Sequence, residues 1–305
     1  MNSRTQVRVP AKINLCLGVG ARRDDGFHPL ATVYQAVDVC DEIRVNLRAD
    51  NEVTVVVTHD GELMSSELVP DGDDNIGVRA AKLLREHAGR PDLGVDIAIR
   101  KEIPVAGGMA GGSADAAGVL VACNELWGFG YSKDELEPIA ANLGSDVPFL
   151  LHGGNALGSG RGELVSQILS RGTFHWVAVT SDVGLSTAAV YAEFDRLNPV
   201  GADEPQIAPE LLAALRTGDP EDLAPALSND LTEAALSLRP DLADVMTVGS
   251  SLGALAALIS GSGPTILFLA RDAAHGDELA AMLTASGLGA DVIQAYGPVQ
   301  GARLI

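Results

Sequence analysis

Apolar and polar residues alternate over much of the first hundred positions. Between Val7 and Val19 one parity is apolar, with the two-residue period of a half-buried strand, and its members are Val7, Val9, Ile13, Leu15, Leu17 and Val19. Lys12 and Asn14 have the opposite parity, so we expect them to face together away from that core. Similar alternation predicts shorter strands at residues 42–47, 53–58 and 95–99.

Helical periods follow these strands. An apolar stripe predicts a helix from Asn75 to His87 that stops at Gly89, and the stripe consists of Ile76, Ala80, Leu83, Leu84 and His87. A second helix is expected from about Ser113, with the stripe Ala116, Val119, Leu120, Cys123, Leu126 and Trp127. Ser132 and Glu135 predict a capping box at the start of a third helix that closes on Gly144. Further helices are expected near residues 209–216, 230–238, 240–248 and 274–286.

The pattern changes after about Arg161, where strands become sparser. Strands are expected again at residues 256–259 and 265–270 and toward the end of the chain. The mixture predicts an α+β protein with two domains, residues 1–160 and 161–305. The uncharged stretch from Leu252 to Ala270 is a membrane candidate, but Ser-Gly-Ser-Gly-Pro divides it into halves too short to span a bilayer, so two buried strands are expected there.

Composition narrows the classes of function. Hydrophobic residues make up 47% of the 305 positions and charged residues 20%, which is enough for a packed core without wholesale disorder. The net charge of −20 repels nucleic acid and anionic membrane, so neither is expected as a partner, and an anionic ligand requires a local positive site. Three cysteines without metal-like spacing and an N-terminus without an apolar signal segment predict a soluble, cytoplasmic protein.

The segment PVAGGMAGGSADAA, from Pro104 to Ala117, has the most specific local pattern in the chain. It places four glycines within residues 107–112, between a predicted strand and a predicted helix. Glycines leave backbone N–H groups open to a ligand, and a helix N-terminus adds free N–H groups and a partial positive charge, a combination that suits phosphate. No lysine follows the last glycine, as a Walker A loop requires, and no Gly-x-Gly-x-x-Gly occurs. A flexible surface turn is the plainer alternative, but a turn needs fewer glycines.

Other candidates are ambiguous when taken one at a time. Lys12 is either an edge-strand lysine in solvent or part of a polar site with an anionic partner, and Asn14 on the same face favours the site. Asp146 is either a helix N-cap before Val147-Pro148 or a proton acceptor. His28 is more typical of a loop than of a ligand site. The segment SGSGPT, residues 260–265, is either a tight turn or a second glycine wall of an active site.

Taken in order, four segments resemble the GHMP kinase family: PAKINLCLGVGARRDDGFHPL, PVAGGMAGGSADAA, LGSDVPFLLHGGNALGSGRGE and ISGSGPTILFL. The resemblance covers nearly the whole chain, and the combination AKINL…DGFH is specific to the branch that acts on a cytidyl-linked polyol. It implies an N-terminal α/β domain like ribosomal protein S5, a ferredoxin-like C-terminal domain and a site in the cleft between them. The implied reaction is ATP-dependent phosphorylation of the 2-hydroxyl of 4-diphosphocytidyl-2-C-methyl-D-erythritol, a small-molecule substrate of the non-mevalonate isoprenoid pathway.

The resemblance also implies roles for individual residues. Asp146 corresponds to the catalytic base, with Lys12 beside it. Polyol and cytidine contacts correspond to Asn14, His28 and Thr187, and the aromatic positions that stack on cytosine to Phe27 and Tyr191. Asn75 and Lys101 correspond to residues near the adenine. The triphosphate cradle corresponds to Pro104, Val105, Ala106, Gly107, Gly108, Met109, Ala110, Gly111, Gly112 and Ser113. Mg²⁺ is the expected companion of ATP; its ligands are left open, with Ser113 as a candidate.

The chain departs from the family pattern at a few positions. Ala106 and Ala110 stand where some members carry glycine, and Phe27 where some carry tyrosine, which keeps the stacking face and loses a hydroxyl. Two alternatives stay open: a GHMP kinase for another small alcohol, such as homoserine or mevalonate, and a nucleotide-binding regulatory module without catalysis. A dinucleotide-dependent oxidoreductase is disfavoured because its fingerprint is missing. The oligomeric state is left open.

Overall fold

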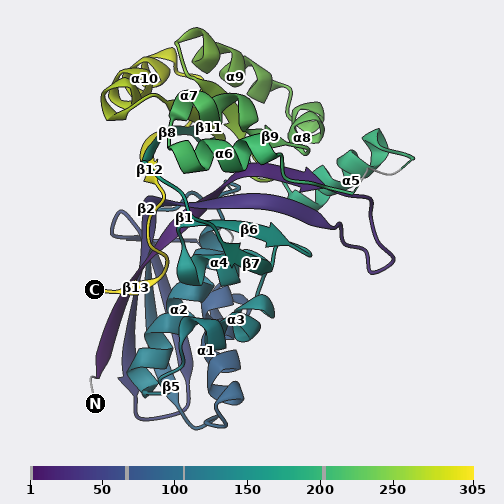
Figure 1. Ribbon diagram of the computed structural model, residues 1–305. Helices are drawn as coiled ribbons and strands as arrows, with labels where there is room; N and C mark the ends of the chain where they lie inside the picture. Colours follow the sequence, from purple (N-terminus) through teal and green to yellow (C-terminus); the bar gives the residue numbers. More distant parts are fainter. Residues whose placement is uncertain (1–2, 66–68, 106, 201–203) are drawn as a thin grey trace.

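The structure is a computed structural model that describes residues 3–65, 69–105, 107–200 and 204–305. Over these ranges the chain forms two β-sheets, one of nine strands and one of four, each covered by helices (Figure 1). The predicted α+β class is therefore confirmed. No helix in the described ranges combines the length and the apolar character needed to cross a membrane.

The strands of the larger sheet come mainly from the N-terminal half of the chain. They are β1 (Arg4–Val19), β2 (Leu30–Arg48), β3 (Val53–His59), β4 (Glu62–Leu63), β5 (Gly94–Lys101), β6 (Asn155–Ser159), β7 (Leu164–Gln167), β9 (Ser228–Asn229) and β13 (Arg303–Leu304). The main path is β13-β1-β2-β5-β3-β4, with β6 beside β2, β7 beside β6 and β9 beside β1. The smaller sheet, in the order β10-β11-β8-β12, consists of β8 (Phe174–Val179), β10 (Ala256–Ile259), β11 (Ile266–Ala270) and β12 (Val292–Gly297).

Helices cover each sheet. The helices beside the larger sheet are α1 (Ile76–His87), α2 (Gly111–Trp127), α3 (Lys133–Ala141) and α4 (Val147–His152), with a short 3₁₀ turn, η1 (Gly72–Asp74), before α1. Of these, α1, α2 and α4 contact strands of the sheet, and α3 packs mainly on α4 and α2. The C-terminal half contains α5 (Thr187–Leu197), α6 (Pro209–Thr217), α7 (Pro220–Leu223), η2 (Ala224–Ala226), α8 (Thr232–Leu238), α9 (Asp241–Ser251) and α10 (Ala273–Ser286). Of these, α9 and α10 pack against strands of the smaller sheet (Figure 1).

A long antiparallel ribbon of β1 and β2 links the two halves of the molecule. Its register runs from Arg4 opposite Asn46 to Val19 opposite Leu30, and its far end reaches the C-terminal half (Figure 1). The register shifts between Pro10 and Ala11, where proline has no N–H to donate, and again just after Asn14. The ribbon thereby carries residues 10–16 from one sheet toward the other.

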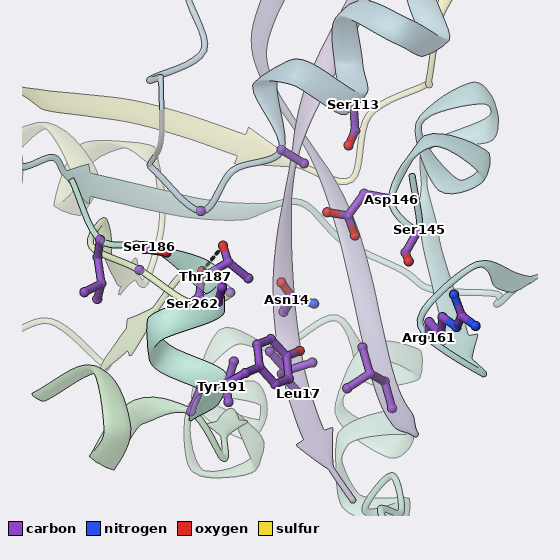
Figure 2. A pocket seen from close by; sticks show the side chains of 18 of the residues that line it. Asn14, Leu17, Ser113, Ser145, Asp146, Arg161, Ser186, Thr187, Tyr191 and Ser262 are labelled. Atoms are coloured by element: carbon purple, nitrogen blue, oxygen red, sulfur yellow. Dashed lines mark hydrogen bonds between the residues drawn. The ribbon is translucent and has the colours of Figure 1, made fainter. Parts of the chain in front are cut away.

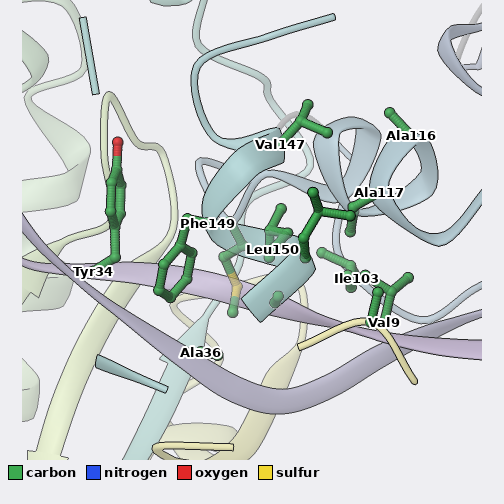
Figure 3. Close-up of a cluster of buried hydrophobic side chains, with 14 of the residues drawn as sticks. Val9, Tyr34, Ala36, Ile103, Ala116, Ala117, Val147, Phe149 and Leu150 are labelled. Atoms are coloured by element: carbon green, nitrogen blue, oxygen red, sulfur yellow. The ribbon is translucent and has the colours of Figure 1, made fainter. Parts of the chain in front are cut away.

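The main core lies between the larger sheet and its helices. Phe149 and Leu150 of α4 and Ala117 of α2 pack over Val9 and its neighbours in the sheet (Figure 3). The small residues of α2 allow close packing: a Cβ on Gly118 would lie 2.5 Å from the Ile43 side chain. Burial of this continuous apolar layer is the chief stabilising contribution to the domain that carries the glycine segment.

Most predicted elements are confirmed. The first strand, the second half of β2, the capping box of α3 and the two strands within Leu252–Ala270 all form. The stripe predicted for α1 is partly wrong: Ile76 and Leu83 are only half-buried and His87 is exposed, because the buried face is made of Gly77, Val78, Ala80, Ala81 and Leu84. Strand β8 and helix α5 were not predicted.

The division into domains at residue 160 stays a prediction. Strand β7 lies beyond that residue and pairs with β6, and β13 returns from the C-terminus to pair with β1. The larger sheet therefore takes strands from both sides of the predicted boundary.

Candidate active site

A cleft of about 1040 Å³ lies where the middle of β1, the glycine segment before α2, the start of α4 and helix α5 converge (Figure 2). Figure 2 shows Ser113, Ser145, Asp146 and Arg161 on one wall, and Thr187 and Tyr191 of α5 on the opposite wall. Asn14 lies between them, on the floor formed by β1.

Asp146 and Lys12 meet in this cleft although they lie in distant parts of the sequence. The Lys12 Nζ lies 3.6 Å from Asp146 Oδ2. Asp146 occupies the N-cap position of α4, but its side chain accepts no capping hydrogen bond among the described residues and is left partly exposed to the cleft. Of the two interpretations left open for Asp146, the cap is not supported: the backbone is helical, with φ of −83° and ψ of −14°, and the side chain caps no amide. The carboxylate instead pairs with Lys12 in the cleft.

Polar contacts along β1 hold Lys12 in place. Only 5% of Lys12 is exposed, and its Nζ donates to Asn14 Oδ1 at 2.8 Å. Asn14 in turn donates to Thr32 Oγ1 at 2.7 Å, and Thr32 donates to the Cys16 carbonyl at 2.6 Å. This chain fixes the position of the ammonium group, which is costly to bury without such partners. The predicted pairing of Lys12 and Asn14 on one polar face is confirmed.

Tyr34 of β2 completes the surroundings of this pair. Its ring stacks on Phe149 with centroids 4.9 Å apart, and Lys12 Nζ lies 5.7 Å from the ring centroid. Burial and the nearby Asp146 carboxylate raise the pKa of Tyr34 well above its usual value. Tyr34 therefore stays neutral at physiological pH, and its buried ring shields one side of the Asp146 carboxylate from water.

The glycine segment carries unpaired amides beside the cleft. The carbonyls of Gly108 and Met109 accept from Ser260 Oγ at 3.1 Å and from the Lys12 amide at 3.2 Å. In a trans peptide the next N–H points the opposite way, so the amides of Met109 and Ala110 point away from these donors. Among the described residues these two amides donate to no partner. The first amides of α2 are likewise free, because a helix leaves its N-terminal N–H groups unpaired.

The start of α2 is unusual in a second way. Its N-cap residue, Ala110, adopts a left-handed conformation with φ of 61° and gives the helix no side-chain cap. This conformation costs a non-glycine residue about 1–2 kcal/mol. The position where some family members carry glycine thus needs the backbone that glycine favours. An uncapped, positively polarised helix end beside free amides is a good anion site.

The segment SGSGPT forms the second glycine wall that the sequence left as one of two possibilities. Gly108 packs against Ser260, and Gly261, with φ of 56°, lies against Lys12 Nζ and Asn14. Ser262 Oγ lies 2.9 Å from Thr187 Oγ1, which ties this wall to helix α5. One side of the cleft is therefore formed by this C-terminal segment, whose backbone carries only small side chains there.

A buried ion cluster lies behind the glycine segment. Lys101 Nζ donates to Asp115 Oδ2 at 2.8 Å, to Asp41 Oδ2 and to the Gly111 carbonyl at 3.2 Å. Asp41 Oδ1 also accepts from the backbone amides of residues 102 and 103. Burial alone would lower the pKa of Lys101, but the attraction of Asp115 and Asp41 raises it by more, so the net shift of this pKa is upward. The cluster clamps both ends of the glycine segment together.

The remaining wall carries aromatic and polar side chains from α5 and the loop after β1. His28 Nε2 lies 2.8 Å from Asp195 Oδ1, and its ring lies 5.0 Å from that of Tyr191. Burial raises the pKa of Tyr191 to about 12, with a smaller contribution from Asp146. Phe27 is 49% exposed and its ring is available for stacking.

Most of the predicted site residues line this cleft. They are Lys12, Asn14, Phe27, His28, Pro104, Gly107, Gly108, Ala110, Gly111, Gly112, Ser113, Asp146, Thr187 and Tyr191. The exceptions have other surroundings: Met109 is buried in the core, Asn75 is the N-cap of α1, Lys101 belongs to the ion cluster, and Val105 is exposed outside the cleft lining. Ala106 lies outside the described residues.

Sequence reasoning missed several lining residues. Tyr34, Ser145, Arg161 and Asp195 belong to the cleft and were not candidates. A helical pattern would have found Asp195, because it follows Thr187 and Tyr191 at four-residue steps on one face of α5. Arg161 lies in the short turn between β6 and β7, and no local pattern distinguishes it.

Comparison with known proteins gives two family matches and close relatives. The model for the GHMP kinases N-terminal domain matches residues 75–154, and the model for the GHMP kinases C-terminal domain matches residues 211–288. A protein of Salinispora arenicola named 4-diphosphocytidyl-2-C-methyl-D-erythritol kinase is 53% identical over 98% of this chain and 94% of its own length. A protein of the same name from Thermobifida fusca is 52% identical over the full length of both.

Among solved structures, the crystal structure of a 4-(cytidine 5'-diphospho)-2C-methyl-D-erythritol kinase matches with a TM-score of 0.76 and 30% identity. The match covers 95% of this chain and 98% of the other. The two-domain GHMP kinase fold expected from the resemblance is thereby confirmed.

Proposed function

The chain belongs to the GHMP kinase family, in the group of the 4-diphosphocytidyl-2-C-methyl-D-erythritol kinases, and we propose that it phosphorylates the 2-hydroxyl of 4-diphosphocytidyl-2-C-methyl-D-erythritol with ATP. The products are the 2-phosphate and ADP, in the non-mevalonate isoprenoid pathway. The observation that carries the proposal is the convergence of Asp146, Lys12 and the glycine segment in one cleft. The cytoplasmic location and the domain division at residue 160 are parts of the same proposal.

Proton removal is the task of Asp146. Its carboxylate faces the cleft and accepts the proton of the substrate hydroxyl as the new O–P bond forms, which typically contributes about 10²- to 10⁴-fold to rate. Lys12, 3.6 Å away, pairs with the carboxylate and lies close enough to neutralise charge on the transferred phosphoryl group. Because Asn14 holds the ammonium, little reorganisation is needed during the reaction.

Phosphate binding is the task of the glycine segment. The free amides of Met109 and Ala110 and the uncapped start of α2 supply hydrogen-bond donors and partial positive charge for the ATP phosphates. The cleft wall beside them carries the hydroxyls of Ser113 and Ser145, and Mg²⁺ takes oxygen ligands. Ser113, next to the helix start, is the proposed contact for Mg²⁺, which when bound would supply further charge neutralisation for the phosphates.

Substrate recognition falls to the opposite wall. Phe27 and Tyr191 offer aromatic faces for cytosine, while His28, Asn14 and Thr187 offer polar groups for the cytidine and the polyol. His28 is oriented by Asp195, so its free ring nitrogen has a fixed direction.

An ADP-release assay with a panel of alcohols tests the proposal. We expect turnover with the cytidyl-linked methylerythritol and little with homoserine or mevalonate. Preferred turnover of homoserine or mevalonate would assign the chain to another GHMP kinase activity. ATP binding without a phosphorylated product from any alcohol would favour a non-catalytic module.

A further inference from the structure

Arg161 lines the cleft, and the proposed reaction gives it no role so far. It lies in the turn between β6 and β7, on the same wall as Asp146 and Ser145 (Figure 2). Its guanidinium carbon lies 3.7 Å from the centroid of the Phe27 ring, in van der Waals contact with the ring face. The arginine is thus placed directly beside one of the two proposed cytosine-stacking rings.

The guanidinium is held in position but keeps free donors. Its Nη2 donates to Asp25 Oδ2 at 3.2 Å, and Asp25 Oδ1 accepts from the Phe27 amide at 3.0 Å. Within the described part of the chain this is the guanidinium's one hydrogen bond, although the group carries five N–H donors. The Arg161–Asp25 pair is largely exposed, and such pairs contribute little stability, so an anion with more charge competes for the arginine readily.

The proposed substrate carries a diphosphate between its cytidine and its reacting hydroxyl. Its cytosine is assigned to Phe27 and Tyr191, and its reacting hydroxyl to Asp146, so the diphosphate that joins the two ends must lie between them. We propose that Arg161 binds this diphosphate, using N–H donors that the stack on Phe27 and the Asp25 contact leave free. The inference rests on the proposed function and adds a specificity residue to it. Phe27 remains half-exposed beneath the arginine, so one ring can support both cytosine and guanidinium.

Other cations of the cleft are less suited to this role. Lys12 is buried and already engaged with Asn14 and Asp146. Arg22 lines the cleft but donates its Nε to the Gly26 carbonyl, at 3.2 Å, within its own loop. Among the cleft cations that the structure describes, only Arg161 has its guanidinium plane stacked on a ring with several donors free, and such a planar fork matches paired phosphate oxygens.

Steady-state kinetics of the full chain test the inference. Arg161→Gln is expected to raise KM for the cytidyl substrate about tenfold or more, with kcat changed less than about twofold and KM for ATP unchanged. Arg161→Lys keeps the positive charge but loses the planar guanidinium, so its KM for the cytidyl substrate should lie between those of the wild type and Arg161→Gln. The matched control is Arg23→Gln: Arg23 also pairs with Asp25, at 3.1 Å, but does not line the cleft, so its KM should stay near that of the wild type.

Calorimetric binding of CDP and cytidine separates this inference from the proposed function. The wild type and Arg23→Gln should bind CDP about tenfold or more tighter than cytidine, and Arg161→Gln should lose this preference. An Arg161→Gln protein that keeps both the CDP preference and a normal substrate KM would overturn the inference and leave the function intact. A wild-type protein that binds neither ligand and does not phosphorylate the cytidyl substrate would overturn both.

Discussion

Gly108 lies so close to Ser260 that a Cβ at this position would fall 2.1 Å from the Ser260 carbonyl oxygen. The φ of Gly108 is +78°, a conformation that side-chain-bearing residues rarely adopt. The glycine segment is therefore held against the C-terminal half of the molecule by a contact that only glycine permits. This contact sets the direction in which the neighbouring amides point.

Replacement of Gly108 by alanine should displace the segment, because the clash is with backbone and no rotamer change relieves it. We expect KM for ATP to rise about tenfold or more, with a smaller effect on KM for the alcohol. Gly276→Ala is the control. Gly276 lies in helix α10 and does not line the cleft, and its added Cβ would make only an ordinary 3.8 Å contact with Ala270 of β11. Equal ATP kinetics in both variants would contradict the proposed role of the segment.

Loss of Lys101 should be strongly destabilising. Lys101→Met leaves two buried acidic side chains, Asp41 and Asp115, without their cation, and such a change typically costs about 3–5 kcal/mol in the free energy of unfolding. Lys82→Met removes an exposed ion pair with Asp73 and should cost about 1 kcal/mol or less. Urea unfolding followed by circular dichroism measures both. Similar losses in the two variants would show that the buried cluster is not a structural clamp.

The stability of the protein should depend on pH through Asp115. Burial raises the pKa of Asp115 well above its usual value, and its Oδ1 has no hydrogen-bond partner among the described residues. The folded state then holds this proton at pH values where the unfolded chain has released it, so the contribution favours folding at low pH and is lost as pH rises. The free energy of unfolding of Asp115→Asn should therefore improve relative to wild type as pH rises from about 4. A difference that stays flat or falls with pH would contradict the raised pKa.

Tyr191 should contribute to binding of the alcohol substrate and not of ATP. If its ring stacks on cytosine, Tyr191→Ala should raise KM for the cytidyl substrate about 5- to 100-fold, since base stacking on an aromatic ring is worth about 1–3 kcal/mol. Tyr191→Phe should stay within about threefold because the ring remains. Tyr296→Ala, on β12 and outside the cleft lining, is the control. An unchanged substrate KM in Tyr191→Ala would remove the ring from the cytidine site.

Much of the site could be predicted from the sequence because its key elements are local patterns. The parity of β1 places Lys12 beside Asn14, and the glycine run before α2 marks the phosphate cradle without reference to other segments. The capping box of α3 and the two strands around SGSGPT are likewise local. Family resemblance supplied what spacing could not, the pairing of Lys12 with Asp146 across the fold.

The rest depends on tertiary contacts that a local pattern does not encode. Arg161 sits in a turn typical of any hairpin, and only the fold brings it over Phe27. The family resemblance placed Lys101 near the adenine, whereas the fold turns it inward against Asp115. Helix α5 was not predicted, and the structure shows only its Val190 and Phe194 fully buried because its other face lines the cleft.

The most direct test of the central claim is the turnover of Asp146→Asn. The amide keeps the shape of the side chain but accepts no proton, so kcat should fall at least about a hundredfold while ATP binding and the unfolding transition stay those of the wild type. Lys12→Ala should also lose about a hundredfold or more, and Asp134→Asn, on the exposed face of α3, should lose nothing. An Asp146→Asn protein that turns over the cytidyl substrate within about threefold of the wild-type rate would contradict the account.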